Sequence, residues 1–330
     1  MIEAEFKAWK GYYPDQIIPL NSGSGSNRLY FRIYKKKSTF IATQNNDIRE
    51  NNAFFYLAQY FANQDIKVPE VYHVSPEKSI YFQQDIGDTN LLEILKKDGL
   101  TRDVKTIYKD SLSMLWHMQS IGKSLDFYKC YPRPSFDQQS IQWDLNYFKY
   151  YFLKVSGLEF DEQLLENDFN VLAAHITKSN QPFFMFRDFQ ARNIHVYDHQ
   201  PWFIDFQGGR RGPLLYDVAS ILYQASANLS EDVRAHLLNH YYELIQSQVD
   251  YPQLQFQQDF VIMVFVRIIQ TLGAYGFRGL IEGKLYFKSS IPKALDNLSS
   301  ITPQINTDVN ISYFLTILSR LVEIKDTFDN

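Results

Sequence analysis

The sequence predicts an α+β protein with a small antiparallel sheet near its N-terminus and a larger helical part after it. Two observations support this division. Within the first ~85 residues, short runs show the alternation that is typical of strands, around one helical stripe. Nearly all later apolar residues follow helical spacing, and the exception lies between residues 183 and 206. We expect residues 1–87 to form an N-lobe and residues 88–330 a C-lobe, with a hinge near Gly87.

The expected elements follow the chain in order. Residues 21–27 form a loop rich in glycine and serine. Strands are expected over 29–34, 39–43, 71–74 and 79–83, with a helix over 49–61. Further helices are expected over 91–95, 104–121, 141–154, 164–175, 216–226, 233–246 and 260–273.

Composition narrows the class of protein. The net charge of -4 gives no general reason to expect a nucleic-acid partner. No uninterrupted apolar run approaches the roughly 18 residues of a membrane span, and the first residues lack the features of a signal peptide. The single cysteine, Cys130, cannot form an internal disulfide. We therefore expect a cytoplasmic protein that acts on a small molecule, without a nucleic-acid, membrane or protein partner.

Polar residues stand at the ends of the short strands expected between residues 183 and 206. Asp188 and Asn193 lie five positions apart on one polar loop, and Asp205 ends a later run and precedes Phe-Gln-Gly. Phosphoryl transfer needs a carboxylate that orients the attacking hydroxyl, and a metal that neutralises phosphate charge. Mg²⁺ accepts one or two protein oxygens and takes its other ligands from phosphates and water. Each acid alone is typical of an ordinary turn, but the ordered set predicts a kinase.

The stretch FRDFQARNIHVYDHQPWFIDFQGGRRGPLLYDVASIL resembles the catalytic segment of the aminoglycoside phosphotransferase and choline kinase superfamily. Within it, the chain is most similar to the bacterial anomeric kinases of N-acetylmuramate and N-acetylglucosamine. That similarity is carried by GSGSNRLYFRI, FQQDIGDTNLLEIL, QWDLNYFKYYFL and RIIQTLGAYGFRGLIEGKLYF, so it spans about residues 20 to 300. The resemblance implies a protein-kinase-like fold and a small-molecule kinase that uses ATP or GTP with Mg²⁺.

The resemblance also implies roles for individual residues. Asp188 is expected to be the catalytic carboxylate, Asn193 and Asp205 the metal ligands, and Asp217 a buried acid that supports the catalytic loop. The nucleotide is expected to contact Ser22, Gly23, Ser24, Gly25, Ser26, Arg28, Arg32, Glu50, Gln84 and Ile86. The substrate is expected to contact Arg192, Arg210, Arg211 and Asp144.

Three positions depart from the family pattern. Phe186 and Gln190 replace histidines two residues before and two residues after the catalytic aspartate. The lysine that grips nucleotide phosphates from the third strand aligns with Thr43. The anomeric kinases also lack this lysine, so the gap favours that subgroup. Another cation is then expected to replace it. Arg28 and Arg32 are the candidates, because their spacing of four places them on one face of a strand.

The substrate expected from these patterns is the anomeric hydroxyl of N-acetylmuramate or N-acetylglucosamine, within cell-wall sugar recycling. The segment GGRRG after Asp205 disfavours a cationic acceptor and suits a neutral sugar or a carboxylate. The subgroup has an acid at the position of Gly208, so a kinase of another small metabolite, aminoglycoside- or choline-like, stays an alternative. A nucleotide-binding pseudokinase with a regulatory role is a second alternative. A protein kinase is disfavoured, because the segment from Asp205 to Asp217 is too short to dock a polypeptide.

Overall fold

The computed structural model describes residues 1–20, 28–178, 183–305 and 308–328. The chain divides into two compact units. The first unit comprises residues 1–114, 126–134 and 192–209, and the second comprises residues 115–125, 135–191 and 210–330. The functional boundary expected near residue 87 stays a prediction.

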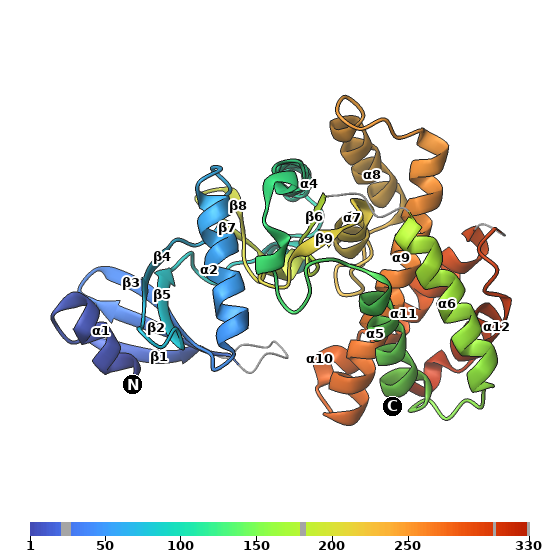
Figure 1. Ribbon diagram of the computed structural model, residues 1–330, viewed down its shortest axis with the longest axis horizontal. Coiled ribbons are helices and arrows are strands. Elements are labelled where there is room, and N and C mark those ends of the chain that lie inside the picture. Colours follow the sequence, from blue (N-terminus) through green and yellow to red (C-terminus); the bar gives the residue numbers. More distant parts are fainter. Residues whose placement is uncertain (21–27, 179–182, 306–307, 329–330) are drawn as a thin grey trace. The chain divides into compact units, whose positions relative to one another are not determined.

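A five-stranded antiparallel sheet of order β1-β2-β3-β5-β4 is the centre of the first unit (Figure 1). Its strands are β1 (Gln16–Leu20), β2 (Leu29–Lys35), β3 (Ser38–Gln44), β4 (Val71–Val74) and β5 (Ile80–Gln84). The sequence predicted all of them except β1. That strand is short and contains Pro19, which an edge strand tolerates because its proline position need not donate to the sheet.

Two helices cover opposite faces of this sheet. Tyr81 and Phe82 are neighbours in β5, so their side chains point to different faces. Phe82 packs against Phe6 of α1 (Ile2–Lys10), with ring centroids 5.6 Å apart. Tyr81 packs against Phe54 of α2 (Ile48–Ala62), with ring centroids 5.1 Å apart. The sheet therefore lies between α1 and α2, as Figure 1 shows.

The rest of the first unit follows β5 or returns later in the chain. It contains α3 (Leu91–Asp98), the larger part of α4 (Arg102–Ile121), the short helix η2 (Phe127–Lys129), and the hairpin of β7 (Ile194–Tyr197) with β8 (Gln200–Phe203).

The second unit is mainly helical. Its long helices are α5 (Gln138–Phe148), α6 (Glu162–Lys178), α7 (Leu215–Leu222), α8 (Glu231–Ile245), α9 (Gln253–Tyr275), α11 (Ile291–Ile301) and α12 (Ser312–Glu323). Its shorter helices are η1 (Gly122–Ser124), η3 (Lys149–Leu153), η5 (Gly276–Ile281), α10 (Leu285–Lys288), η6 (Thr302–Gln304) and η7 (Lys325–Phe328). The strands β6 (Phe183–Met185) and β9 (Arg210–Gly212) form a small antiparallel sheet, and η4 (Ala191–Asn193) crosses into the first unit. The predicted α+β class is confirmed.

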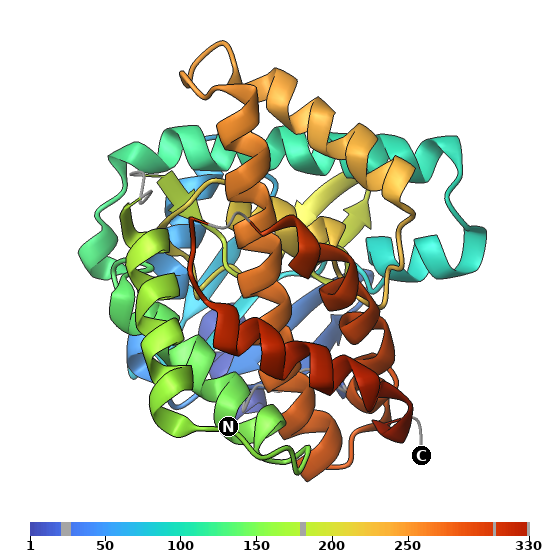
Figure 2. The same cartoon turned by 90° about the vertical axis from the view of Figure 1, so that its right-hand side faces the viewer.

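Helix α9 is the core helix of the second unit, and Figure 2 shows it in orange among the other helices. By length and composition alone, residues 253–281 could cross a membrane, but 72% of the apolar window is buried inside the protein. The apolar character of α9 is therefore explained by packing. The expectation that no segment is apolar enough to span a membrane therefore overlooked α9, because Arg267 divides its apolar run into shorter stretches.

Candidate active site

The loop that carries Asp188, residues 186–191, is held at both ends by the region of α7. Asp217 accepts hydrogen bonds from the first two backbone N–H groups of the loop, at 2.7 and 2.9 Å. Gln224, just after α7, accepts a hydrogen bond from the last N–H group, at 2.8 Å. These contacts fix the backbone on both sides of Asp188.

The carboxyl group of Asp217 is fully buried. Burial raises the pKa of Asp217 to about 7, while the N–H groups of Phe186 and Arg187 and the charge of Arg267 act in the opposite direction. The acid that supports the loop therefore titrates near neutral pH.

Arg187, directly before Asp188, has a positive φ of 84°. A non-glycine residue in that region is strained and needs surrounding contacts to hold it. Its guanidinium donates to both carboxylate oxygens of Asp144 on α5, at 2.6 and 2.7 Å, and to the hydroxyl of Tyr216 at 2.9 Å. Burial opposes the charge of Arg187, but Asp144 and Tyr216 outweigh it and raise the pKa of Arg187. Because both oxygens of Asp144 are engaged here, its contact with substrate stays a prediction.

The residue that replaces the family histidine, Phe186, is fully buried. Its ring packs edge-on against Phe189, with centroids 5.3 Å apart. Aromatic packing within the loop therefore occupies the position of the histidine.

Asp188, the predicted catalytic carboxylate, contacts a residue that was not predicted from the sequence. Arg267 of α9 donates to Oδ1 of Asp188 at 3.2 Å. The side chain of Asp188 is 39% exposed, whereas that of Arg267 is only 5% exposed. A single arginine inside the apolar run VIMVFVRIIQ was the available signal, because a buried charge needs a partner of opposite charge.

Arg267 also lines a cavity of about 320 Å³, open solvent included. The other lining residues are Gln190, Ser220, Tyr223, Gln224, Ala225, Ile268, Thr271, Tyr275 and Ala294. Gln190 is two residues after Asp188, so the cavity adjoins the catalytic loop. In the part of the chain that the structure describes, no aspartate or glutamate lines it.

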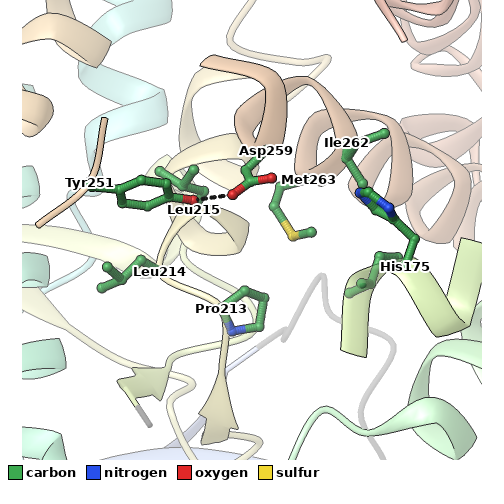
Figure 3. A pocket seen from close by; sticks show the side chains of 9 residues that line it. His175, Pro213, Leu214, Leu215, Tyr251, Asp259, Ile262 and Met263 are labelled. Carbon is green, nitrogen blue, oxygen red and sulfur yellow. Dashed lines mark hydrogen bonds between the residues drawn. The ribbon is translucent and has the colours of Figure 1, made fainter. Parts of the chain in front are cut away.

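Figure 3 shows a second cavity, of about 340 Å³, among α6, α7 and the first half of α9. His175, Leu215 and Met263 line it, and the hydroxyl of Tyr251 donates to Asp259 at 2.5 Å. Its lining includes no residue that the sequence predicted for the site, so it is not the candidate for substrate binding.

Asn193 and Asp205 lie in the first unit, and the β7–β8 hairpin brings them together. Ile194 pairs with Phe203, which places the residues that flank the hairpin side by side. The amide of Asn193 donates to Oδ2 of Asp205 at 3.3 Å, and the amide of Gln207 donates to Oδ1 at 2.8 Å. Asp205 also has a positive φ, of 69°. This carboxylate is thus held in a strained backbone by two side-chain amides.

A carboxylate beside an amide oxygen fits a hard divalent cation that takes its other ligands from phosphates and water. Among the described residues, no group of three or more His, Cys, Asp or Glu side chains could hold a metal alone. A metal held by Asn193 and Asp205 would therefore take its remaining ligands from other sources, such as phosphates and water. Asp188 belongs to the other unit, and a shared site for all three residues stays a prediction.

Phe206, directly after the predicted metal ligand, anchors this segment to α2. Its buried ring stacks on Phe54, with centroids 5.3 Å apart, and meets Phe61 edge-on at 5.8 Å. Glu50 lies one turn before Phe54 on the same helix. The predicted metal ligands and the helix glutamate therefore belong to one compact unit.

Glu50 forms an ion pair with Arg28, whose Nε lies 3.2 Å from Oε2 of Glu50. Arg28 is 4% exposed. Burial opposes its charge, but Tyr81, Tyr30 and Glu50 together raise the pKa of Arg28. Asn45 donates to the same oxygen of Glu50 at 2.8 Å. A cation is therefore stabilised next to the helix glutamate.

Tyr30 interacts electrostatically with Arg28 of this ion pair and with Asp205, the predicted metal ligand. It lies opposite the fully buried Thr43 in the β2–β3 pairing, and Arg28 precedes it by two residues. Burial raises the pKa of Tyr30, Arg28 lowers it, and Asp205 raises it. The phenol of Tyr30 is therefore within electrostatic reach of both Arg28 and Asp205.

Arg32 has a different environment. Its guanidinium donates to both oxygens of Asp85, at 2.8 and 3.1 Å, and to both oxygens of Asp88, each at 2.7 Å. These acids belong to the predicted hinge, where Gln84 ends β5 and Ile86 is buried. Arg32 thus ties the hinge segment to β2. The phosphate loop expected at Ser22, Gly23, Ser24, Gly25 and Ser26 lies outside the described residues.

The arginines predicted for substrate differ in exposure. Nε of Arg192 is buried and has no hydrogen-bond partner among the described residues. Arg210 is 6% exposed, and burial together with the charge of Arg187 lowers the pKa of Arg210 to about 10. The side chain of Arg211 is exposed, because neighbours alternate along β9. GGRRG therefore places only one of its two arginines at the surface, and their substrate contacts stay predictions.

Known proteins are similar to this chain along most of its length. The model of the phosphotransferase enzyme family matches residues 16–256. An N-acetylmuramate/N-acetylglucosamine kinase of Neisseria meningitidis serogroup B is 22% identical over 314 residues, which cover 91% of each chain. A protein of the same description from Pseudomonas aeruginosa is 22% identical over 241 residues, covering 72% of this chain and 68% of that protein.

Solved structures show the fold. The gentamicin complex of the aminoglycoside phosphotransferase APH(2")-IIa has a TM-score of 0.61 at 13% identity, covering 88% of this chain and 94% of that chain. A choline kinase of Cryptosporidium parvum has a TM-score of 0.57 at 13% identity, covering 88% of this chain and 92% of that chain. The predicted protein-kinase-like fold is confirmed.

Proposed function

The chain belongs to the phosphotransferase enzyme family, and on that premise we propose that it phosphorylates the anomeric hydroxyl of N-acetylmuramate or N-acetylglucosamine. The observation that carries this proposal is the lining of the cavity beside the catalytic loop. That lining contains Arg267 and side-chain amides and, among the described residues, no carboxylate. Aminoglycosides and choline are cations, which a lining without acids among its described residues does not attract. A neutral sugar suits the side-chain amides and hydroxyls of this lining.

Each part of the predicted catalytic set has a distinct task in this reaction. Asp188 orients the acceptor hydroxyl, while Asn193 and Asp205 hold a divalent metal, with Mg²⁺ as the proposed ion. When bound, the metal neutralises the charge that spreads over the phosphate oxygens. The nucleotide is ATP or GTP. Its base faces Gln84 and Ile86 at the hinge.

Arg28 takes the place of the missing third-strand lysine. It precedes Tyr30 by two residues, and Tyr30 pairs with Thr43, where that lysine is expected. Its pairing with Glu50, a residue predicted for the nucleotide site, supports this role. Arg32 is the weaker candidate, since Asp85 and Asp88 already neutralise it.

The acceptor side is assigned to Arg192, Arg210, Arg211 and Asp144. The buried Nε of Arg192 supports an anionic contact. The relatives described as N-acetylmuramate/N-acetylglucosamine kinases support an amino sugar. We place the reaction in the cytoplasm, in the recycling of cell-wall sugars, with the sugar 1-phosphate as product.

A coupled assay for nucleoside diphosphate release tests the proposal, with N-acetylmuramate, N-acetylglucosamine, kanamycin and choline as acceptors. We expect turnover of at least one amino sugar. Asp188→Ala should abolish this turnover and keep nucleotide binding, because Asp188 orients the hydroxyl and does not hold phosphate. Turnover of kanamycin or choline, without either sugar, overturns the assigned substrate. Nucleotide binding without turnover of any acceptor favours the pseudokinase alternative.

A further inference from the structure

We propose that Arg267 is the positioning residue of the catalytic carboxylate. It holds Oδ1 of Asp188 and thereby presents Oδ2 to the hydroxyl that is phosphorylated. This inference rests on the proposed phosphoryl transfer through Asp188. Arg267 is the first residue of the segment RIIQTLGAYGFRGL. The nucleotide and metal ligands proposed above do not explain why an arginine stands there.

The guanidinium of Arg267 is fixed at each of its three nitrogens. Nε donates to the hydroxyl of Ser220 at 2.9 Å, one terminal nitrogen donates to Asp188 at 3.2 Å, and the other donates to Gln270. A guanidinium is planar and rigid, so three contacts define the orientation of the whole group. The donor that faces Asp188 therefore has a set position and direction.

Helix α7 supports both the backbone and the side chain of the catalytic residue. Asp217 holds the two N–H groups that precede Asp188. Ser220, three residues later on the same helix, holds the arginine that holds the carboxylate. Helix α7 thus fixes the backbone of the loop through Asp217, and it fixes the orientation of the Asp188 carboxylate through Ser220 and Arg267.

The reaction needs this control because the terminal torsion of an aspartate is broad, and the side chain of Asp188 is 39% exposed. In the transfer, the acceptor oxygen bonds to the γ-phosphorus as the bond from phosphorus to the β,γ-bridging oxygen breaks. The nucleoside diphosphate leaves with that electron pair, and the hydroxyl proton passes to Oδ2 of Asp188. A misplacement of about 1 Å at such a centre costs roughly 100-fold in rate.

Burial alone does not explain Arg267, and Arg234 is a matched case for comparison. Arg234 on α8 is also 4% exposed, and it pairs with Glu231 at 2.7 Å and with Asn297 at 2.9 Å. Its partners lie outside the catalytic loop, and it does not line the cavity beside that loop. Arg234→Met therefore reproduces the loss of a buried arginine without touching Asp188.

The kinetic test compares Arg267→Met, Arg267→Lys and Arg234→Met with an amino sugar that the native protein phosphorylates. We expect Arg267→Met to lower kcat roughly 100-fold, with the acceptor KM and the Kd for ADP within about threefold of native. Arg267→Lys should lower kcat only about tenfold, since lysine keeps the positive charge but lacks the planar guanidinium with its several donors. In a protein that already carries Asp188→Asn, Arg267→Met should lower kcat further by less than about threefold, because the carboxylate that it positions is absent. A native kcat with a raised acceptor KM overturns positioning, as does an equal kcat loss in Arg234→Met.

Thermal unfolding tests the same inference without an acceptor. If the native protein phosphorylates no sugar, the proposed substrate has failed, and the unfolding data alone decide the role of Arg267. Asp188→Asn should lower the melting temperature in the native background, because it removes the carboxylate that forms an ion pair with the buried arginine. In the Arg267→Met background the same change should not lower it. Equal shifts in the two backgrounds show that the residues are uncoupled and overturn the inference.

Discussion

Arg28 and Glu50 form an ion pair in the first unit, with Nε of Arg28 3.2 Å from Oε2 of Glu50. The arginine is 4% exposed, whereas the side chain of the glutamate is 30% exposed. Taking a cation out of water is costly unless it is paired, and here one carboxylate and two phenols lie close to the guanidinium. Tyr30 is electrostatically coupled to both this cation and Asp205, which supports the proposal that Arg28 binds a nucleotide phosphate.

Arg28→Met should weaken ADP binding ten- to a hundredfold, because a charge-assisted hydrogen bond contributes about 1.5–3 kcal/mol. Arg28→Lys should recover part of the loss. Isothermal titration of ADP measures both. Arg49→Met is the control, since Arg49 is an exposed arginine on the same helix as Glu50 and its loss should leave the Kd unchanged. An unchanged Kd in a folded Arg28→Met protein contradicts the assignment.

The sequence predicted those parts of the fold and site that depend on local pattern. Four of the five strands of the main sheet follow from alternation. The order and spacing of Asp188, Asn193 and Asp205 indicated a site, whose roles stay a prediction. Asn193 and Asp205 meet because the β7–β8 register brings together residues that are close in the chain.

Contacts between distant segments could not be predicted in this way. Arg267 reaches Asp188 across 79 positions, and Arg187 reaches Asp144 across 43 positions. Only the folded backbone determines which acid meets which arginine. For the same reason the sequence treated Arg28 and Arg32 as equivalent, although Arg32 is engaged by two hinge acids.

Close packing between α9–η5 and α5–η3 leads to a second prediction. A Cβ added at Gly276 would lie 2.0 Å from the backbone oxygen of Tyr151, a distance that side-chain motion cannot relieve. Gly276→Ala should therefore destabilise the protein by about 1–3 kcal/mol. In a helix without such a neighbour, the same change stabilises by about 0.4–1 kcal/mol. The sign of the change in the free energy of unfolding, measured with urea, therefore tests the close contact. A stabilised variant would show that the two segments are not in close contact.

The buried carboxyl group of Asp217 gives the stability of the protein a pH dependence. Burial raises the pKa of Asp217 from 3.8 to about 7 in the folded chain, so the folded state binds the proton more tightly than the unfolded state. This contribution is fully present below pH 3.8 and is lost as the pH rises through about 7. Asp217→Asn cannot ionise, so the stability of the native protein relative to this variant should fall by about 1.4 kcal/mol per pH unit between these limits. Urea unfolding of both proteins at pH 4.5, 5.5, 6.5 and 7.5 (~1 unit apart) measures the difference. A difference that stays constant over this range would mean that the two N–H groups and Arg267 outweigh burial and hold the pKa of Asp217 at or below its ordinary value.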